Sequence, residues 1–124
     1  MQVSDFGSDL TAGYAAAAIP ARYTLELHRW SDAAALDAAS VPSPVSKAIV
    51  YHAKATGSAR TGDVAGATQA IARLQELHDS VVQAKEGYWA AQVEIQRREA
   101  AAWLLHAQQK NEEAVAMMRS AAEL

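Results

Sequence analysis

Apolar side chains return every three or four residues along most of the chain, a spacing that predicts amphipathic helices. The pattern is clearest over residues 87–109, where good helix formers follow Gly87 without a proline. One face of this segment carries Trp89, Val93, Gln96, Ala100, Trp103 and Ala107. Polar residues, among them Glu94 and Arg98, fall on the other side. We interpret the segment as the central helix of a small helical stack.

Turn-forming residues divide the chain before this helix. We expect residues 1–8 to be flexible and a helix to begin near Asp9, with a break or kink at Pro20, because an internal proline costs a helix about 3 kcal/mol. Pro44 favours the first position of a helix that ends near Arg60. Gly62 then supplies a positive φ, and Asp63 caps the next helix.

These signals predict three helix pairs in a single domain over residues 1–124. The expected pairs cover residues of about 20–40, 44–84 and 87–124, with a short helix over 31–39, turns near 84–87 and 110–111, and a closing helix over 112–123. No segment shows the alternation of a strand bounded by hairpin turns. The predicted fold is therefore all-α, with about five to seven helices.

Composition changes the expected core. Hydrophobic residues make up 51% of the chain, but 30 of them are alanines, which bury little area. We therefore expect the large side chains, namely the three tryptophans, the four tyrosines and the scattered Leu, Ile and Val, to contribute disproportionately.

Charge and cysteine content exclude several functions. A net charge of −3 without a basic cluster argues against a nucleic-acid partner. The absence of cysteine excludes disulfides, thiolate metal sites and cysteine nucleophiles. No apolar run reaches the roughly 18 residues of a membrane span, and the N-terminus lacks a signal-peptide pattern, so we expect a cytoplasmic protein without a membrane partner.

The turn over residues 61–67 carries a family resemblance. Its glycine, aspartate and later Ala67 resemble the Gly-Asx-x-x-x-Ala turn of the tetratricopeptide repeat, with less complete copies over residues 29–33 and 109–114. Ala33 and Ala67 are 34 residues apart, the usual period of that repeat, whereas Ala67 and Ala114 are 47 apart. The resemblance implies antiparallel helical hairpins stacked as a short, divergent α-solenoid. A plain helical bundle without repeats is the alternative.

In such repeats, the first helix of each pair lines a concave groove that binds peptides. Transferring these positions to this chain, the groove residues are His52, Thr56, Arg60, Gln96, Glu99, Trp103 and His106. The resemblance thus implies a non-enzymatic module that binds a protein, peptide or helix. Core packing of Trp103 and ordinary surface positions for the two histidines are the competing interpretations.

The sequence contains no catalytic or metal-binding motif that would favour another function. There is no His-Glu-x-x-His, phosphate-binding loop, nucleophile elbow or pair of catalytic carboxylates. We therefore expect no enzyme activity, cofactor or metal. The alternative is a helical bundle that binds a small ligand or metal between helices through His52, Glu99 and His106.

The closing helix presents an apolar face formed by Val115, Met118 and Ala122. This face either turns inward or is covered by a second copy of the chain, because a terminal repeat otherwise exposes its apolar side. We expect self-association, most simply as a homodimer.

Overall fold

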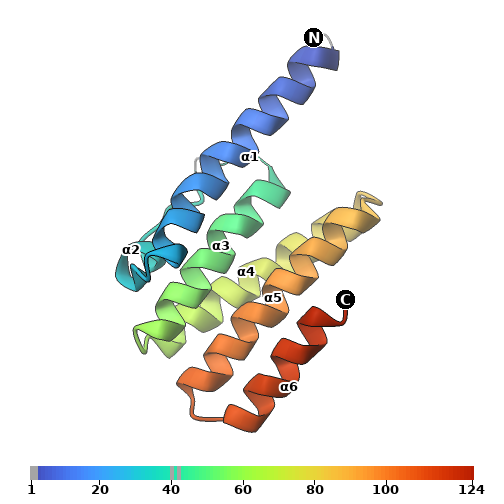
Figure 1. Cartoon of the computed structure of the whole chain (residues 1–124). Coiled ribbons are helices and arrows are strands. Elements are labelled where there is room, and N and C mark those ends of the chain that lie inside the picture. Colours follow the sequence, from blue (N-terminus) through green and yellow to red (C-terminus); the bar gives the residue numbers. More distant parts are fainter. Residues whose placement is uncertain (1–2, 40, 42) are drawn as a thin grey trace.

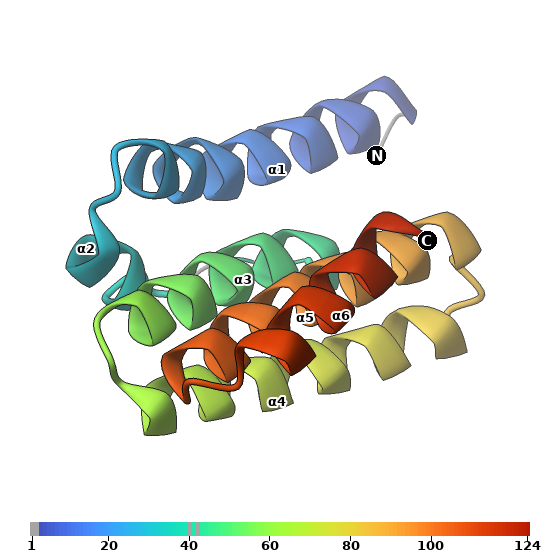
Figure 2. The same cartoon turned by 60° about the horizontal axis from the view of Figure 1, so that its bottom comes forward.

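The computed structural model describes residues 3–39, 41 and 43–124, which form an all-α protein of six helices (Figure 1). The helices are α1 (Val3–Glu26), α2 (Trp30–Ala34), α3 (Pro44–Arg60), α4 (Val64–Gln83), α5 (Gly87–Ala107) and α6 (Asn111–Ala122). Helices α1, α3, α5 and α6 lie in a row, and α4 packs behind α3 and α5 (Figures 1 and 2). None of the described helices is both long and apolar enough to cross a membrane.

The helices pack in a regular order. Each helix contacts the next along the chain, and α3 and α5 also contact the helix two positions before them, namely α1 and α3. Helix α3 therefore packs against α1, α2, α4 and α5, while α5 packs against α3, α4 and α6. The predicted central helix, α5, shares the centre of the molecule with α3.

Four of the interhelical turns have the same backbone geometry. Two residues after the last residue of the helix, each turn has a residue with positive φ, namely His28 (54°), Gly62 (85°), Lys85 (61°) and Gln109 (64°). The next residue caps the following helix in a half-extended conformation, with ψ between 65° and 81°. The Gly62–Asp63 turn confirms its prediction in full, because the Asp63 carboxylate also accepts a hydrogen bond from the Gly66 N–H, at 2.9 Å.

An alanine follows each of these turns at the same distance. The four alanines are Ala33, Ala67, Ala90 and Ala114, and all are buried. Each N–H donates to the carbonyl of the capping residue, at 2.9–3.0 Å. The sequence pattern identified three of these alanines and missed Ala90, because neither Lys85 nor Glu86 resembles the expected glycine and Asx residues.

The core is built mainly from alanine. Among the residues whose burial is described, sixteen of the twenty buried hydrophobic side chains are alanines, and the largest fully buried ones are Leu74 and Val93. The three tryptophans are partly buried, and Tyr23 and Tyr88 are exposed. Large side chains are therefore rare among the fully buried residues, because closely packed helices leave room only for small residues between them. The expectation that the large side chains contribute disproportionately to stability stays a prediction.

The first helix pair differs from its prediction. Helix α1 begins at Val3 rather than near Asp9 and passes through Pro20 without a break. Proline has no N–H, so the Ala16 carbonyl loses its helical hydrogen bond. Ala16 and Pro20 both lie on the exposed side of α1, where water can donate to this carbonyl instead. Helix α2 ends at Ala34, well before the predicted end near residue 39. The flexibility of residues 1–8 stays a prediction, and residues 1–2 lie outside the described part of the chain.

Gly57 sets the distance between α2 and α3. A Cβ atom at this position would overlap the Trp30 carbonyl oxygen and lie 2.7 Å from the Ala34 nitrogen and 2.8 Å from the Ala33 Cβ. From the same helix, the Lys54 Nζ donates to the carbonyls of Ala34 at 3.0 Å and Leu36 at 2.6 Å. The glycine that the sequence marks as a weak helical position is therefore what lets α2 lie directly on α3.

We predict that Gly57→Ala lowers the free energy of unfolding by about 1–3 kcal/mol, although Gly→Ala usually stabilises a helix interior by up to about 1 kcal/mol. The reason is the overlap with the backbone of α2. Urea unfolding monitored by circular dichroism measures the change. Gly87→Ala is the matched control, because a Cβ at Gly87 meets no atom within 4 Å. Equal stabilisation by both substitutions would contradict the prediction.

Candidate functional site

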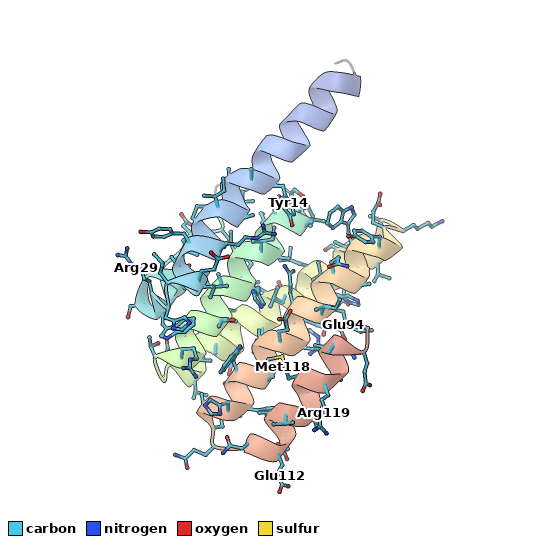
Figure 3. All side chains as sticks on the ribbon, viewed as in Figure 1. Tyr14, Arg29, Glu94, Glu112, Met118 and Arg119 are labelled. Atoms are coloured by element: carbon cyan, nitrogen blue, oxygen red, sulfur yellow. The ribbon has the colours of Figure 1, made fainter. Side chains whose placement is uncertain are left out.

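A cleft of about 290 Å³ opens between α1, α3 and α5. Its walls are formed by Tyr14, Ala21, Arg22 and Leu25 from α1, Ile49 and His52 from α3, and Gln92, Ile95, Gln96 and Glu99 from α5. Tyr14 projects from α1 toward the beginning of α5 (Figure 3), where its ring lies 6.3 Å from that of Trp89. Three of the predicted groove residues, His52, Gln96 and Glu99, thus meet in one cleft.

The polar side chains of the cleft have no partner in the described part of the chain. No hydrogen bond or ion pair of Arg22, His52, Gln92, Gln96 or Glu99 occurs among the described residues. Burial lowers the pKa of His52 to about 4 and raises the pKa of Glu99. At neutral pH, the cleft therefore offers a neutral imidazole and two amides, beside a carboxyl group and a guanidinium.

An ion-pair network lies on the side of α5 opposite the cleft. The Glu94 carboxylate accepts hydrogen bonds from Arg97 Nε at 2.6 Å and Arg98 Nε at 3.0 Å, three and four residues further along the helix. Hydrogen bonds from Arg97, and then from Arg98, hold the pKa of Glu94 at about 2. Arg98 Nη1 also donates to the Ser120 carbonyl of α6, at 3.1 Å. These contacts secure α5 against α6 while its glutamines line the cleft.

Thr56 does not line the cleft, although it lies one helical turn beyond His52. Its side chain is buried at 5% exposure, and its hydroxyl oxygen has no hydrogen-bond partner among the described residues. Helical spacing from His52 could not reveal this difference, because it depends on how closely the neighbouring helices approach α3. Thr56 is therefore a packing residue of the helix interface.

Arg60 and Trp103 take part in a ladder of stacked rings and one cation. The Arg60 guanidinium carbon lies 5.3 Å from the centre of the Trp30 ring and 4.7 Å from that of Trp103. At the ends of the ladder, His28 stacks on Trp30 at 4.9 Å, and His106 meets Trp103 edge to face at 5.8 Å. The ladder connects all three helix pairs at the end where α3 joins α4. Cation–π contacts of this kind stabilise exposed sites by about 0.5–1 kcal/mol each.

His106 is separate from His52 and Glu99. Its ring nitrogen Nδ1 lies 3.1 Å from the Asn111 amide oxygen, and its side chain lines another groove, between α5 and α6. Within the described ranges, no three His, Asp or Glu side chains form a group that could hold a metal ion. The three residues of the alternative ligand site therefore do not converge, although His52 and Glu99 share the cleft.

Sequence reasoning missed the contribution of α1 to this site. Tyr14, Arg22 and Leu25 line the cleft because α1 continues through Pro20. The helical spacing of the buried Ala17 and Ala21 on either side of the proline was the available signal. Gln92 was missed as well, although it lies exactly four residues before Gln96 on the same helical face.

The fold and the cleft define a small all-α protein of six helices in its described part. In comparisons with known proteins, the chain matches no family model, no curated protein and no solved structure.

We predict that Thr56→Val raises the free energy of unfolding by about 1 kcal/mol, because it replaces an unpartnered buried hydroxyl with a methyl group of similar shape. Thr24→Val is the matched control. Thr24 is also buried, but its Oγ1 donates to the Ala21 carbonyl at 2.8 Å. This second substitution should be neutral or destabilising. The prediction fails if thermal and urea unfolding give the two variants the same gain.

A second prediction concerns pH. The pKa of His52 is about 4 in the folded protein and about 6.5 when unfolded, so the unfolded chain binds more protons between these values. The contribution of neutral His52 to the free energy of unfolding is fully present above pH 6.5 and is lost as the pH falls towards 4. Between pH 7 and pH 4.5, we expect the wild type to lose roughly 1–3 kcal/mol more stability than His52→Gln.

Glu99→Gln is the control for this experiment. The raised pKa of Glu99 means that the folded protein binds more protons than the unfolded chain just above pH 4.5, so its contribution has the opposite sign. Removing Glu99 should therefore make the loss of stability on acidification steeper. Parallel stability–pH curves for the wild type and His52→Gln would contradict the prediction for His52.

Proposed function

We propose that this protein is a non-enzymatic interaction module, of divergent tetratricopeptide-like form, that holds an extended peptide in the cleft between α1, α3 and α5. The observation that carries the proposal is the set of polar side chains in this cleft that have no partner among the described residues. A surface of this kind leaves donors and acceptors available to a ligand.

The order of helix packing supports the repeat-like form. The first helix of each pair contacts the first helix of the next pair, as α1 contacts α3 and α3 contacts α5. The cleft is lined by these first helices, which is where the family resemblance locates a peptide groove. The repeated turn, with its buried alanine at a constant distance, supports the same interpretation.

The chemistry of the cleft fits a peptide backbone. Gln92 and Gln96 are one turn apart on α5, and each offers both an amide donor and an amide acceptor, which matches the N–H and C=O groups of an extended chain. Ile49 and Ile95 provide apolar contacts between these polar groups. Such a mixture of apolar walls and a few polar groups is typical of binding clefts.

A small molecule is the second candidate ligand. His52 and Glu99 line the same cleft, and its volume of about 290 Å³ is close to the lower end for small-ligand pockets, roughly 300–1,000 Å³. The predicted small-ligand site combined His52, Glu99 and His106, but His106 lies in another groove. We favour the peptide because Gln92 and Gln96, two amide side chains one helical turn apart, line one wall of the cleft.

Selection from a phage-displayed peptide library tests the proposal. The double variant Gln92→Ala/Gln96→Ala should weaken binding of the selected peptides by about 5- to 150-fold, since each lost hydrogen bond contributes about 0.5–1.5 kcal/mol. The matched control is Gln75→Ala/Gln83→Ala on the exposed side of α4, which should bind like the wild type. The proposal is wrong if no peptide is enriched, or if the enriched peptides bind both double variants equally well.

A further inference from the structure

An apolar groove of about 310 Å³ lies between α5 and α6. It is lined by Ala102, Trp103 and His106 from α5 and by Ala114, Val115 and Met118 from α6. Val115 is 51% exposed, so the apolar face predicted on the closing helix is only partly turned inward. Met118 projects from α6 toward α5, whereas Arg119 points away from the core (Figure 3).

A second apolar surface lies at the other edge of the molecule, on α1. Ile19, Tyr23 and Leu27 are spaced by four residues along and just after this helix and are 68%, 53% and 55% exposed. They lie opposite the side that carries the buried Ala17 and Ala21. A solvent-facing helix is normally polar, so this stripe is unusual. We call Ile19, Tyr23 and Leu27 the α1 stripe.

The packing order of the chain shows what kind of element fits the α5–α6 groove. Helix α3 packs against both α1 and α2, and α5 packs in the same way against both α3 and α4. By the same order, a further helix would pack against both α5 and α6, in the groove between them. Helices α1 and α6 lie at opposite edges of the row in Figure 1, with α3 and α5 between them, so the α1 stripe of the same molecule does not reach this groove.

Both edges carry charged side chains beside their apolar surfaces. On α1, Glu26 lies beside Tyr23 and Leu27, and the Arg29 guanidinium carbon lies 5.8 Å from the centre of the Tyr23 ring; on α6, Arg119 lies one helical turn from Val115. Neither Glu26 nor Arg119 forms an ion pair with another described residue. A contact between the two edges can therefore pair Glu26 of one molecule with Arg119 of the next.

We propose that the protein associates head to tail, with the α1 stripe of one molecule seated in the α5–α6 groove of the next. The two surfaces are different, so the contact is heterologous and leaves one groove and one stripe open at the ends of every open assembly. The assembly then continues as a chain or closes as a ring. This goes beyond a homodimer built on one shared face, and it leaves the cleft between α1, α3 and α5 outside the contact.

Two variants that each block one end test the proposal. Ile19→Glu places a charge in the α1 stripe, and Val115→Glu places one in the groove; both positions are exposed, so folding should be retained and is checked by circular dichroism. Sedimentation velocity at 10–200 µM should give a mass for the wild type that rises with concentration beyond a dimer. Each variant alone should remain a monomer of 13.2 kDa.

The decisive sample is the equimolar mixture of the two variants. Ile19→Glu retains its groove and Val115→Glu retains its stripe, so the mixture should form a 1:1 complex of about 26 kDa, twice the monomer mass of 13.2 kDa, and grow no further. Leu27→Glu replaces Ile19→Glu if the first variant loses helical signal. The matched controls, Tyr88→Glu at a position 68% exposed and Val82→Glu at a position 51% exposed, should assemble like the wild type.

Three results would overturn the proposal. A strictly monomeric wild type at 200 µM would mean that the groove serves another occupant. A dimer that persists in Ile19→Glu but is lost in Val115→Glu, with no complex in the mixture, would mean that two grooves face each other. Loss of assembly in the control variants would mean that added charge alone prevents association.

Discussion

The structure depends on how closely its helices approach one another, and small residues set that distance. Alanines occupy most of the buried hydrophobic positions, and Gly57 brings α3 so near to α2 that even one added methyl group would overlap the backbone. Dispersion and burial of many small contacts then replace the large interlocking side chains of an ordinary core. The same constraint explains why no tryptophan is fully buried. The rings of Trp30 and Trp103 lie against the Arg60 guanidinium, and the Trp103 ring also meets His106.

Close packing also shapes the cleft. Because α1, α3 and α5 lie beside one another on small residues such as Ala21, Ala48 and Ala100, the longer side chains of these helices are directed to the open side. On the opposite side of α5, Arg98 contacts the Ser120 carbonyl of α6, while Gln96 and Glu99 line the cleft. The packing therefore leaves the polar side chains of the cleft without hydrogen-bond partners among the described residues and partly buries the Glu99 carboxyl group.

The sequence predicted the regular elements well where local signals were strong. Helices α3 to α6 and the turn at Gly62 follow from proline, glycine and Asx positions that act over a few residues. The sequence-based expectation of a helix break at Pro20 failed. The cost of a proline inside a helix can be inferred from the sequence, but the exposure of that side of α1 and the packing of α1 on α3, which offset the cost, cannot. For the site, the family resemblance grouped His52, Gln96 and Glu99, which line one cleft in the structure, but it could not show that Thr56 is buried or that Arg60 lies between two tryptophan rings.

By itself, the sequence determined an all-α chain, its main helix boundaries and the conformation of the Gly62–Asp63 turn. These features depend on propensities, capping and a 3.6-residue period, which act along the chain. Only the tertiary structure decided which residues share a cleft, which polar groups have partners, and that Gly57 is required for contact rather than tolerated as a weak position. The reason is that an alanine side chain is a single methyl group and does not specify which neighbour it packs against. The distances between helices, which decide the shape of the cleft and the contacts of Gly57, are therefore determined only when all the helices are packed.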